Sequence, residues 1–176
     1  MQRSRFLLAS SLLGVLALAA PARAETKVEL KGVHLCCQGC VKEVGSILGK
    51  IDGVTPKCDQ KNKTVTITAT DDQAAQKALD ALAKGGYYGD TGNAKLAIKD
   101  DSGATKGKVK TLTLTGIHNC CGNCCKAIKE TVKKVDGTKS DDAKPKMDTF
   151  TVTGDFDAAD LVKALNAAGF HVKVKK

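Results

Sequence analysis

Six of the eight cysteines lie in two short segments that share the spacing Cys-Cys-x-x-Cys. They are Cys36, Cys37 and Cys40 in the first segment and Cys120, Cys121 and Cys124 in the second. Two cysteines three residues apart, the second of which opens a helix, can turn both sulfur atoms toward one point. The unpaired N–H groups and the positive end of the dipole at a helix N-terminus favour the thiolate over the thiol. Each segment is therefore a candidate metal site.

Thiolate sulfur is the ligand that soft metal ions prefer, which here means Cu(I), Zn(II), Cd(II) or Hg(II). A pair of sulfurs suits the near-linear coordination of Cu(I) or Hg(II), whereas zinc requires four ligands. The additional cysteine of each segment, Cys36 or Cys120, permits a site with three sulfurs, or a small cluster if the two segments meet. We expect Cu(I) to be the preferred ion, with Zn(II) or Cd(II) second.

A disulfide or redox role for these cysteines is the main alternative. Cysteines in exported proteins often pair, and eight of them allow so many connectivities that the sequence fixes no pairing. The six cysteines crowd into two short loops, whereas disulfides that stabilise a fold usually close longer loops. A Cys37–Cys40 or Cys121–Cys124 bond would instead act as a redox switch. Both uses remain open, and we favour metal ligation.

Two histidines and the two remaining cysteines have less defined roles. His34 and His118 lie two residues before the cysteine runs. Each imidazole could add a nitrogen ligand, or could hydrogen-bond the loop backbone and fix its shape. Cys125 is the counterpart of Val41, which begins the apolar stripe of a predicted helix in the first repeat. We therefore interpret Cys125 as a core thiol. Cys58 has no counterpart cysteine, so it is interpreted as a half-exposed strand thiol or a partner for another cysteine rather than as a metal ligand.

The cysteine segments belong to an internal repeat. Residues 32–40, GVHLCCQGC, recur as residues 116–124, GIHNCCGNC, at an offset of 84 residues (116 − 32). A duplication followed by divergence produces this pattern. The sequence therefore predicts two metal-binding domains, residues 25–99 and 109–176. The polar, glycine-containing residues 100–108 between them are typical of a linker.

Both repeats show the same order of predicted elements, β-α-β-β-α-β. Alternating apolar residues predict strands, and apolar residues at helical spacing predict two amphipathic helices in each repeat. In the first repeat the elements span residues 26–33, 41–51, 54–58, 64–70 and 73–84, followed by a final strand. In the second repeat they span residues 111–115, 121–135, 138–142, 149–153, 158–168 and 170–174. This order predicts an α+β fold of two tandem ferredoxin-like sandwiches, each with two helices on one face of a four-stranded antiparallel sheet.

A Cys-x-x-Cys at the first strand–helix junction of such a unit resembles the heavy-metal-associated (HMA) domain family. Cys37-Gln-Gly-Cys40 and Cys121-Gly-Asn-Cys124 match the family's metal-binding pair. The sequence departs from the family in having Leu35 and Asn119 where methionine is usual. The resemblance implies a non-enzymatic protein that binds a soft metal ion for sequestration, buffering or metallochaperone-type transfer. The implied partners are the metal ion and another metal-binding domain or a membrane metal transporter.

Residues 1–24 have the three parts of a secretory signal peptide. Residues 1–5 carry two arginines, residues 6–20 form an uncharged apolar run, and residues 21–24 end in Ala-x-Ala. The apolar run is shorter than an ordinary transmembrane helix. We therefore expect export, cleavage after Ala24, and a mature protein in the periplasm or outside the cell that is not embedded in the membrane.

Composition and missing motifs argue against other functions. Aromatic residues make up only 3% of the chain, which leaves few ring faces on which nucleotides or sugars could stack. The net charge of +9 falls to +6 once the three arginines of the signal peptide are removed, and we expect no nucleic-acid partner. The sequence contains no Gly-x-Ser-x-Gly, Walker or His-Glu-x-x-His motif, so we expect no enzymatic activity. The remaining alternatives to a metal binder are a thiol–disulfide redox protein and a disulfide-stapled interaction module.

Overall fold

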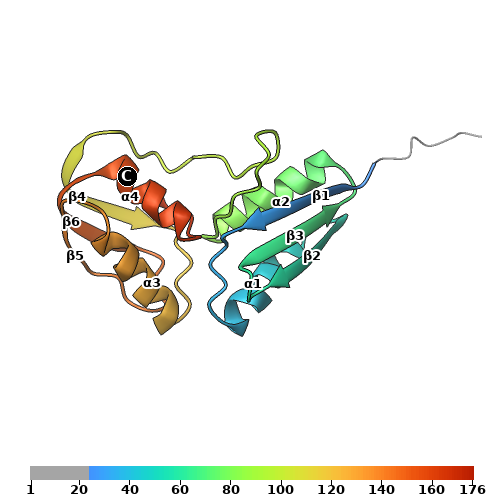
Figure 1. The fold of residues 1–176 in the computed structure, drawn as a ribbon, viewed down its shortest axis with the longest axis horizontal. Coiled ribbons are helices and arrows are strands. Elements are labelled where there is room, and N and C mark those ends of the chain that lie inside the picture. Colours follow the sequence, from blue (N-terminus) through green and yellow to red (C-terminus); the bar gives the residue numbers. More distant parts are fainter. Residues whose placement is uncertain (1–23) are drawn as a thin grey trace, which may run out of the picture.

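Each half of the chain folds around one antiparallel sheet with two helices packed against it (Figure 1). The computed structural model describes residues 24–176, so the predicted signal peptide, residues 1–24, lies outside the described residues except for Ala24. Within the described part of the chain, no helix is both long enough and apolar enough to cross a bilayer.

Among the described residues, the first unit contains three strands and two helices. They are β1 (Thr26–Lys31), α1 (Gln38–Leu48), β2 (Val54–Asp59), β3 (Thr64–Ala69) and α2 (Asp72–Lys84). The strand order is β1-β3-β2, and β3 is antiparallel to both neighbours. Alternate residues of β3, Val65 and Ile67, are fully buried because successive side chains point to opposite faces and the helices cover one of these faces.

The second unit repeats this plan with one more strand in its described residues. Its elements are β4 (Lys108–Thr115), α3 (Gly122–Lys133), β5 (Thr138–Asp141), β6 (Phe150–Asp157), α4 (Ala158–Ala167) and β7 (Lys173–Val174). The strand order is β5-β6-β4-β7, antiparallel throughout. Phe150, Val152 and Phe156 of β6 are buried on the face that the helices cover.

The α+β fold and its two units are therefore as predicted, but the last strand of the first repeat is not formed. Lys31 and Asp90 make a single isolated antiparallel bridge, with N···O distances of 2.8 and 2.9 Å. Before this bridge the chain pairs with the other unit, because Tyr87 bridges Phe170 and the Tyr88 N–H donates to the Gly169 carbonyl at 3.0 Å. Backbone groups that would extend a fourth strand are thus used to join the two units.

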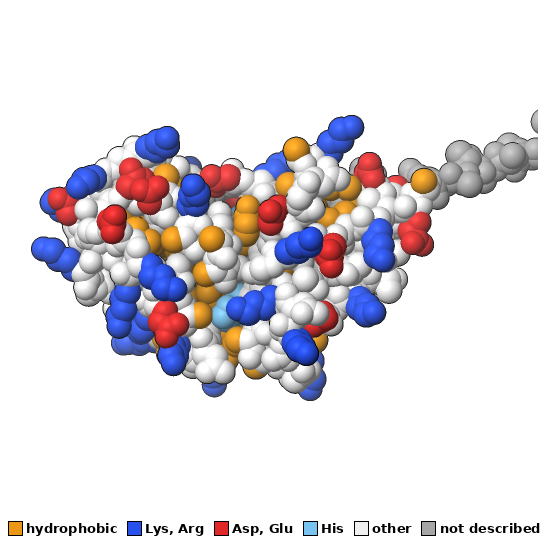
Figure 2. All heavy atoms as spheres, in the orientation of Figure 1, with side chains coloured by type: hydrophobic (Ala, Val, Ile, Leu, Met, Phe, Trp, Pro, Cys, Tyr) orange, Lys and Arg blue, Asp and Glu red, His pale blue; other side chains and the backbone are white. Residues whose placement is uncertain are grey.

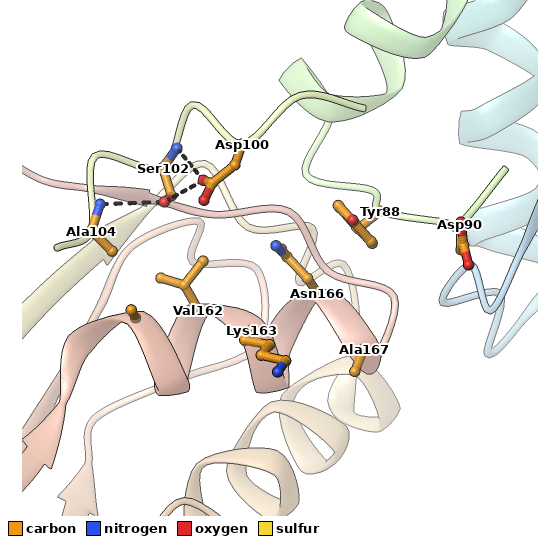
Figure 3. Close-up of a pocket in the computed structure, with 10 residues that line it drawn as sticks. Tyr88, Asp90, Asp100, Ser102, Ala104, Val162, Lys163, Asn166 and Ala167 are labelled. Carbon is orange, nitrogen blue, oxygen red and sulfur yellow. Dashed lines mark hydrogen bonds between the residues drawn. The ribbon is translucent and has the colours of Figure 1, made fainter. Parts of the chain in front are cut away.

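The segment between the units, residues 91–107, has no helix or strand in the described chain and lies against both units. On the side of the first unit, the Gln76 side chain of α2 donates to the Ala97 carbonyl at 3.0 Å. Ser102 is buried, and its carbonyl accepts a hydrogen bond from the Val174 N–H at 2.8 Å. The Ser102 hydroxyl and N–H donate to Asp100 at 2.6 and 3.1 Å (Figure 3). The pocket drawn in Figure 3 lies between this segment and α4 and is lined by no cysteine. It is therefore separate from the predicted metal ligands.

Two glycines at equivalent positions allow the units to approach closely. Gly86 follows α2 with φ of +80°, and a Cβ at this position would lie 2.1 Å from the backbone nitrogen of His118. Gly169 follows α4 with φ of +89°, and a Cβ there would lie 2.4 Å from the backbone nitrogen of His34. A side chain at either glycine would collide with the backbone of the opposite cysteine loop. Each unit therefore positions the cysteine loop of the other, and the two loops run next to each other at the junction (Figure 1).

Candidate metal centre

Both cysteine loops end at the start of a helix, as the spacing predicts. Cys37 is the N-cap residue of α1 and Cys121 is the N-cap residue of α3, each with extended backbone. Cys40 and Cys124 lie in the first turn of these helices and are 0% exposed. The extended N-cap followed by a helical turn brings the two sulfurs of each pair together. The Sγ atoms are 3.8 Å apart in the first pair and 3.7 Å apart in the second.

The two loops face each other across the junction, so that six sulfurs form one group. We call Cys36, Cys37, Cys40, Cys120, Cys121 and Cys124 the sulfur cluster. Between the loops, Cys36 Sγ lies 3.4 Å from Cys124 Sγ and 3.7 Å from Cys121 Sγ. Cys40 Sγ lies 3.9 Å from Cys120 Sγ. All six are thiols without a disulfide in this structure. The sequence predicts a cluster only if the two segments meet, and here they do.

The sulfurs differ in how readily they ionise. The backbone N–H of Cys124 is the largest cause that lowers the pKa of Cys121, to about 7, as expected at a helix N-terminus. Hydrogen bonding from the Cys124 thiol, with a further contribution from His118, holds the pKa of Cys40 far below its ordinary range, although burial opposes this. Burial raises the pKa of Cys120 to about 12 and also raises that of Cys36. Thiolates thus accept hydrogen bonds from neighbouring thiols, and metal binding would release those protons.

His118 is held by groups from both units. Its ring is 5% exposed and stacks on Tyr87, with centroids 4.3 Å apart. Its Nε2 lies 3.4 Å from Cys40 Sγ and 3.1 Å from Tyr87 Oη. Its Nδ1 lies 3.4 Å from Oε2 of Glu43 on α1. One ring nitrogen therefore faces the sulfur cluster while the other faces a carboxylate.

His34, the equivalent residue in the first loop, has a different environment. Its ring stacks on Phe170, with centroids 4.2 Å apart, and its Nε2 is buried without a hydrogen-bond partner among the described residues. Burial lowers the pKa of His34 to about 4, so the ring is neutral at pH 7. Phe170 offers no hydroxyl, and Ala127 stands where the first repeat has Glu43. The hydroxyl and carboxylate beside His118 thus have no equivalents at the corresponding positions around His34.

Three sets of side chains have ligand atoms that lie within 4.8 Å of one another and could each hold a metal ion. They are Cys40, His118, Cys120 and Cys124; His34, Cys36 and Cys124; and Cys36, Cys37 and Cys121. Every candidate ligand predicted from the sequence, both histidines included, belongs to at least one set. Each set also combines residues of both units, which the repeat pattern alone does not predict.

A groove at the junction connects this centre to the surface. It has a volume of about 490 Å³, and its lining includes Glu43, His118, Cys120 and Met147. Met147 is 53% exposed. In the space-filling view, a histidine and several hydrophobic side chains are visible between the two halves, with lysines and acidic residues around them (Figure 2). A metal ion or a small partner group can therefore reach Cys120 from solvent.

The remaining two cysteines lie outside these sets. Cys125 is buried on α3, and its thiol donates to the Ala143 carbonyl at 3.3 Å. Cys58 is half-buried on β2, and burial raises its pKa. Neither cysteine contributes a ligand atom to the three sets.

Three residues that support the centre were assigned no supporting role from the sequence: Glu43, Tyr87 and Asn119, of which Asn119 was noted only as a departure from the methionine that is usual in the family. The Asn119 side-chain amide donates to the carbonyls of Lys144 and Met147 at 2.7 and 3.2 Å, which ties the second loop to the chain between β5 and β6. The sequence does contain one feature that could have identified them, because each of the three differs in residue type from its counterpart in the other repeat. The counterparts of Glu43, Tyr87 and Asn119 are Ala127, Phe170 and Leu35, respectively.

Comparison with known proteins supports the assignment of the second unit. Residues 112–171 match the model of the heavy-metal-associated domain. This unit, which carries the loop Cys-Cys-x-x-Cys at a strand–helix junction, is therefore similar to a heavy-metal-associated domain. The match does not extend to residues 25–99, so a second copy of the domain there remains a prediction from the repeat.

Several solved structures are similar to the chain. Oxidized MerP from Ralstonia metallidurans CH34 is 28% identical, and the alignment covers 38% of this chain and 97% of that chain with a TM-score of 0.36. The N-terminal soluble domains of Bacillus subtilis CopA are 16% identical over 87% of this chain and 95% of that chain, with a TM-score of 0.32. None of the curated proteins compared matches the sequence. The domain match and the sulfur cluster together support metal binding or a metallochaperone function.

Proposed function

We propose that this protein is an exported soft-metal-binding protein that takes up Cu(I) and sequesters it, buffers it or passes it on. The observation that supports this most is the sulfur cluster, in which the sulfurs of two separate loops approach to between 3.4 and 3.9 Å. Thiolates in this number suit Cu(I), and they also bind Zn(II), Cd(II) and Hg(II). Low pKa values at Cys40 and Cys121 favour capture, because a metal ion then displaces fewer protons.

Transfer to a partner fits the same geometry. A thiolate of the partner that approaches through the groove would meet Cys120 and could join the coordination of the metal before a sulfur of this protein leaves. Stepwise exchange through three-coordinate intermediates moves the ion without releasing it to water. The partners that fit this chemistry are another metal-binding domain or a membrane metal transporter.

Metal counting by native mass spectrometry on anaerobically purified protein tests the proposal. We expect bound Cu(I), and we expect the double variant Cys37→Ser, Cys121→Ser to lose tight binding while its circular dichroism is unchanged. Cys58→Ser is the matched control, because Cys58 lies outside the three ligand sets. Unchanged Cu(I) affinity in the double variant would remove the loops from the function.

Export is tested separately. Cleavage after Ala24 would leave a mature chain that begins at Glu25, and its intact mass in the exported fraction distinguishes it from the full chain. Retention of residues 1–24 in the mature protein would contradict this part of the proposal.

A thiol–disulfide redox function is the second candidate, because Cys121 and Cys124 lie 3.7 Å apart and the pKa of Cys121 is about 7. Equilibration with reduced and oxidised glutathione, followed by thiol counting, separates the two functions. A loop disulfide that forms reversibly in a mildly oxidising buffer, together with a lack of metal affinity, would favour the redox function.

A further inference from the structure

Two of the three ligand sets share no residue. Cys40, His118, Cys120 and Cys124 form the first, and Cys36, Cys37 and Cys121 form the second. Together they use every member of the sulfur cluster once, with His118 as the only addition. The remaining set, His34 with Cys36 and Cys124, takes one cysteine from each of the other two and cannot be filled together with them. The structure therefore offers two complete and different coordination sets at the same time.

The two sets differ in the metal that they suit. Three thiolates and one imidazole provide four ligands, which is the number that Zn(II) takes in a closed tetrahedral site. Three of these four residues, Cys40, His118 and Cys124, are buried. Three thiolates without a nitrogen ligand suit a soft ion that accepts three-coordination, as Cu(I) does. The residues of the second set, Cys36, Cys37 and Cys121, are only partly buried.

The orientation of His118 supports its role as a ligand. A metal-bound histidine almost always donates its other ring N–H to a carboxylate, a carbonyl or water, which fixes the tautomer. Here Nε2 faces Cys40 Sγ at 3.4 Å while Nδ1 faces Glu43 Oε2 at 3.4 Å. The Tyr87 hydroxyl, which now lies 3.1 Å from Nε2, has the Cys40 carbonyl within 3.5 Å as another acceptor. A metal ion at Nε2 would therefore not leave that hydroxyl without a partner.

His34 provides an internal comparison. It occupies the same position in its loop, but Ala127 replaces the carboxylate and Phe170 replaces the tyrosine. Among the described residues, the groups that can orient an imidazole toward a metal thus lie on the His118 side of the junction and not beside His34.

We propose that Cys40, His118, Cys120 and Cys124 form a tetrahedral site for Zn(II) or Cd(II), distinct from a three-thiolate site for Cu(I) at Cys36, Cys37 and Cys121. The proposal rests on the soft-metal function proposed above and adds that the chain holds two inequivalent ions, each bound by residues of both units. Two separate heavy-metal-associated domains would instead hold one ion each in equivalent sites. The difference between the two descriptions is measurable.

Co(II) added anaerobically to the full mature chain is the spectroscopic probe, because tetrahedral Co(II) absorbs strongly in the visible region and thiolate ligation adds charge-transfer bands. We expect one tetrahedral Co(II) per chain, displaced by Zn(II) but retained after addition of one equivalent of Cu(I). His118→Gln should abolish the tetrahedral spectrum, and His34→Gln is the matched control that should leave it unchanged. Cys37→Ser should leave the Co(II) spectrum intact and weaken Cu(I) binding.

Because His118 is buried, the comparison with His118→Gln requires that the metal-free variant keeps the circular dichroism of the parent. Glu43→Gln avoids this concern, since the Glu43 side chain is 44% exposed. Loss of the carboxylate behind a histidine ligand should weaken Co(II) binding by about 10–100-fold. Lys42→Gln, at the neighbouring position, should have no such effect.

Three outcomes overturn the proposal while leaving the proposed function intact. One is two equivalent Co(II) ions per chain, and another is a greater effect of His34→Gln than of His118→Gln. The third is a copper cluster that expels Co(II) at one equivalent of Cu(I). If neither Cu(I) nor Co(II) binds to the reduced protein, the proposed function itself fails.

Discussion

The two cysteine loops carry the same candidate ligands but are supported differently. In the first loop, Leu35 is buried among apolar side chains. In the second loop, the equivalent Asn119 is buried and fastens the loop to the chain between β5 and β6 through two side-chain hydrogen bonds. The histidines differ in the same way, since His118 has three polar neighbours while the Nε2 atom of His34 has no hydrogen-bond partner among the described residues. Divergence has thus changed the surroundings of the ligands while the cysteines have stayed the same.

The junction itself is nearly symmetric. Gly86 and Gly169 make equivalent approaches to the opposite loop, and Tyr87 and Phe170 form the bridge between them. Because the junction is nearly symmetric while the surroundings of His34 and His118 differ, equivalent substitutions in the two halves can be compared within one molecule. The following predictions use this comparison, from the largest expected effect to the smallest.

Substitution of either junction glycine should separate the loops. Gly86→Ala would place a Cβ 2.1 Å from a backbone nitrogen at a positive φ, and Gly169→Ala would place one 2.4 Å from another. We expect each to weaken the contact between the units by roughly 2–4 kcal/mol, because L-residues disfavour this φ and backbone atoms cannot rotate away. Small-angle scattering should show a more extended molecule, with weaker metal binding.

Gly45→Ala is the control for these variants. Gly45 lies inside α1 with no atom within 4 Å of the added Cβ, so alanine should stabilise the protein by about 0.5–1 kcal/mol. Equal metal affinity in Gly45→Ala and Gly86→Ala would show that the loops meet without the close contact of the units.

Removal of the Asn119 side chain tests the support that is specific to the second loop. Asn119→Ala should destabilise the protein by about 1–3 kcal/mol, because the two hydrogen bonds from its buried side chain to the carbonyls of Lys144 and Met147 are lost. Urea denaturation measures this change. Asn123→Ala, at an exposed position of α3, should change stability by less than about 0.5 kcal/mol. A similar effect of both variants would show that Asn119 does not fix the loop.

An exchange of aromatic residues tests the difference between the histidines. Tyr87→Phe removes the hydroxyl beside His118 and should cost about 1 kcal/mol. Phe170→Tyr adds a hydroxyl near His34, whose buried Nε2 has no hydrogen-bond partner among the described residues, and should cost less than Tyr87→Phe. Thermal unfolding of both variants and of the double exchange measures the asymmetry. Equal effects would mean that the two histidine environments are energetically alike.

Asp101, which has no counterpart in the first unit, should show the smallest effect. Burial raises the pKa of Asp101, but the hydrogen bond from Lys173 and the nearby His171 lower it by more, so that the pKa lies below its ordinary value. A carboxylate with a lowered pKa contributes stability above its unfolded value of about 3.9, and this contribution is lost as the pH falls through the folded value.

Asp101→Asn should therefore cost roughly 0.5 kcal/mol at pH 7, since half of the side chain is exposed, and progressively less as the pH falls below about 4. Urea denaturation at pH 7 and again below about pH 4 tests this. A cost that does not depend on pH would show that the carboxylate charge is not involved.

The sequence was sufficient to predict the elements that carry the ligands. The apolar stripe from Val41 onward and the strand-like alternation of residues 64–70 agree with α1 and β3. The cysteine spacing also predicted that Cys37 and Cys40 would meet at the start of a helix. These features depend on residues close together in the chain, where periodicity and capping determine the structure.

The arrangement of the two loops could not be predicted in the same way. It depends on contacts of Gly86 and Gly169 with the backbone of the opposite repeat, more than 30 residues away in the sequence. Periodicity within one segment of the sequence does not predict contacts of this kind. From the sequence, Glu43 is indistinguishable from an ordinary surface residue of an amphipathic helix. Its contact with His118 is visible in the three-dimensional structure alone. The missing fourth strand of the first unit has the same origin, because Tyr87 and Tyr88 pair across the junction.

Since every candidate ligand set takes residues from both halves, binding of a metal at any of them would be coupled to closure of the junction. By thermodynamic reciprocity, an ion that binds more tightly to the closed form holds the halves together by the same free energy that closure adds to its own affinity. A partner protein that separates the two halves would thereby lower the affinity for the bound metal ion without contacting any of the cysteine sulfurs.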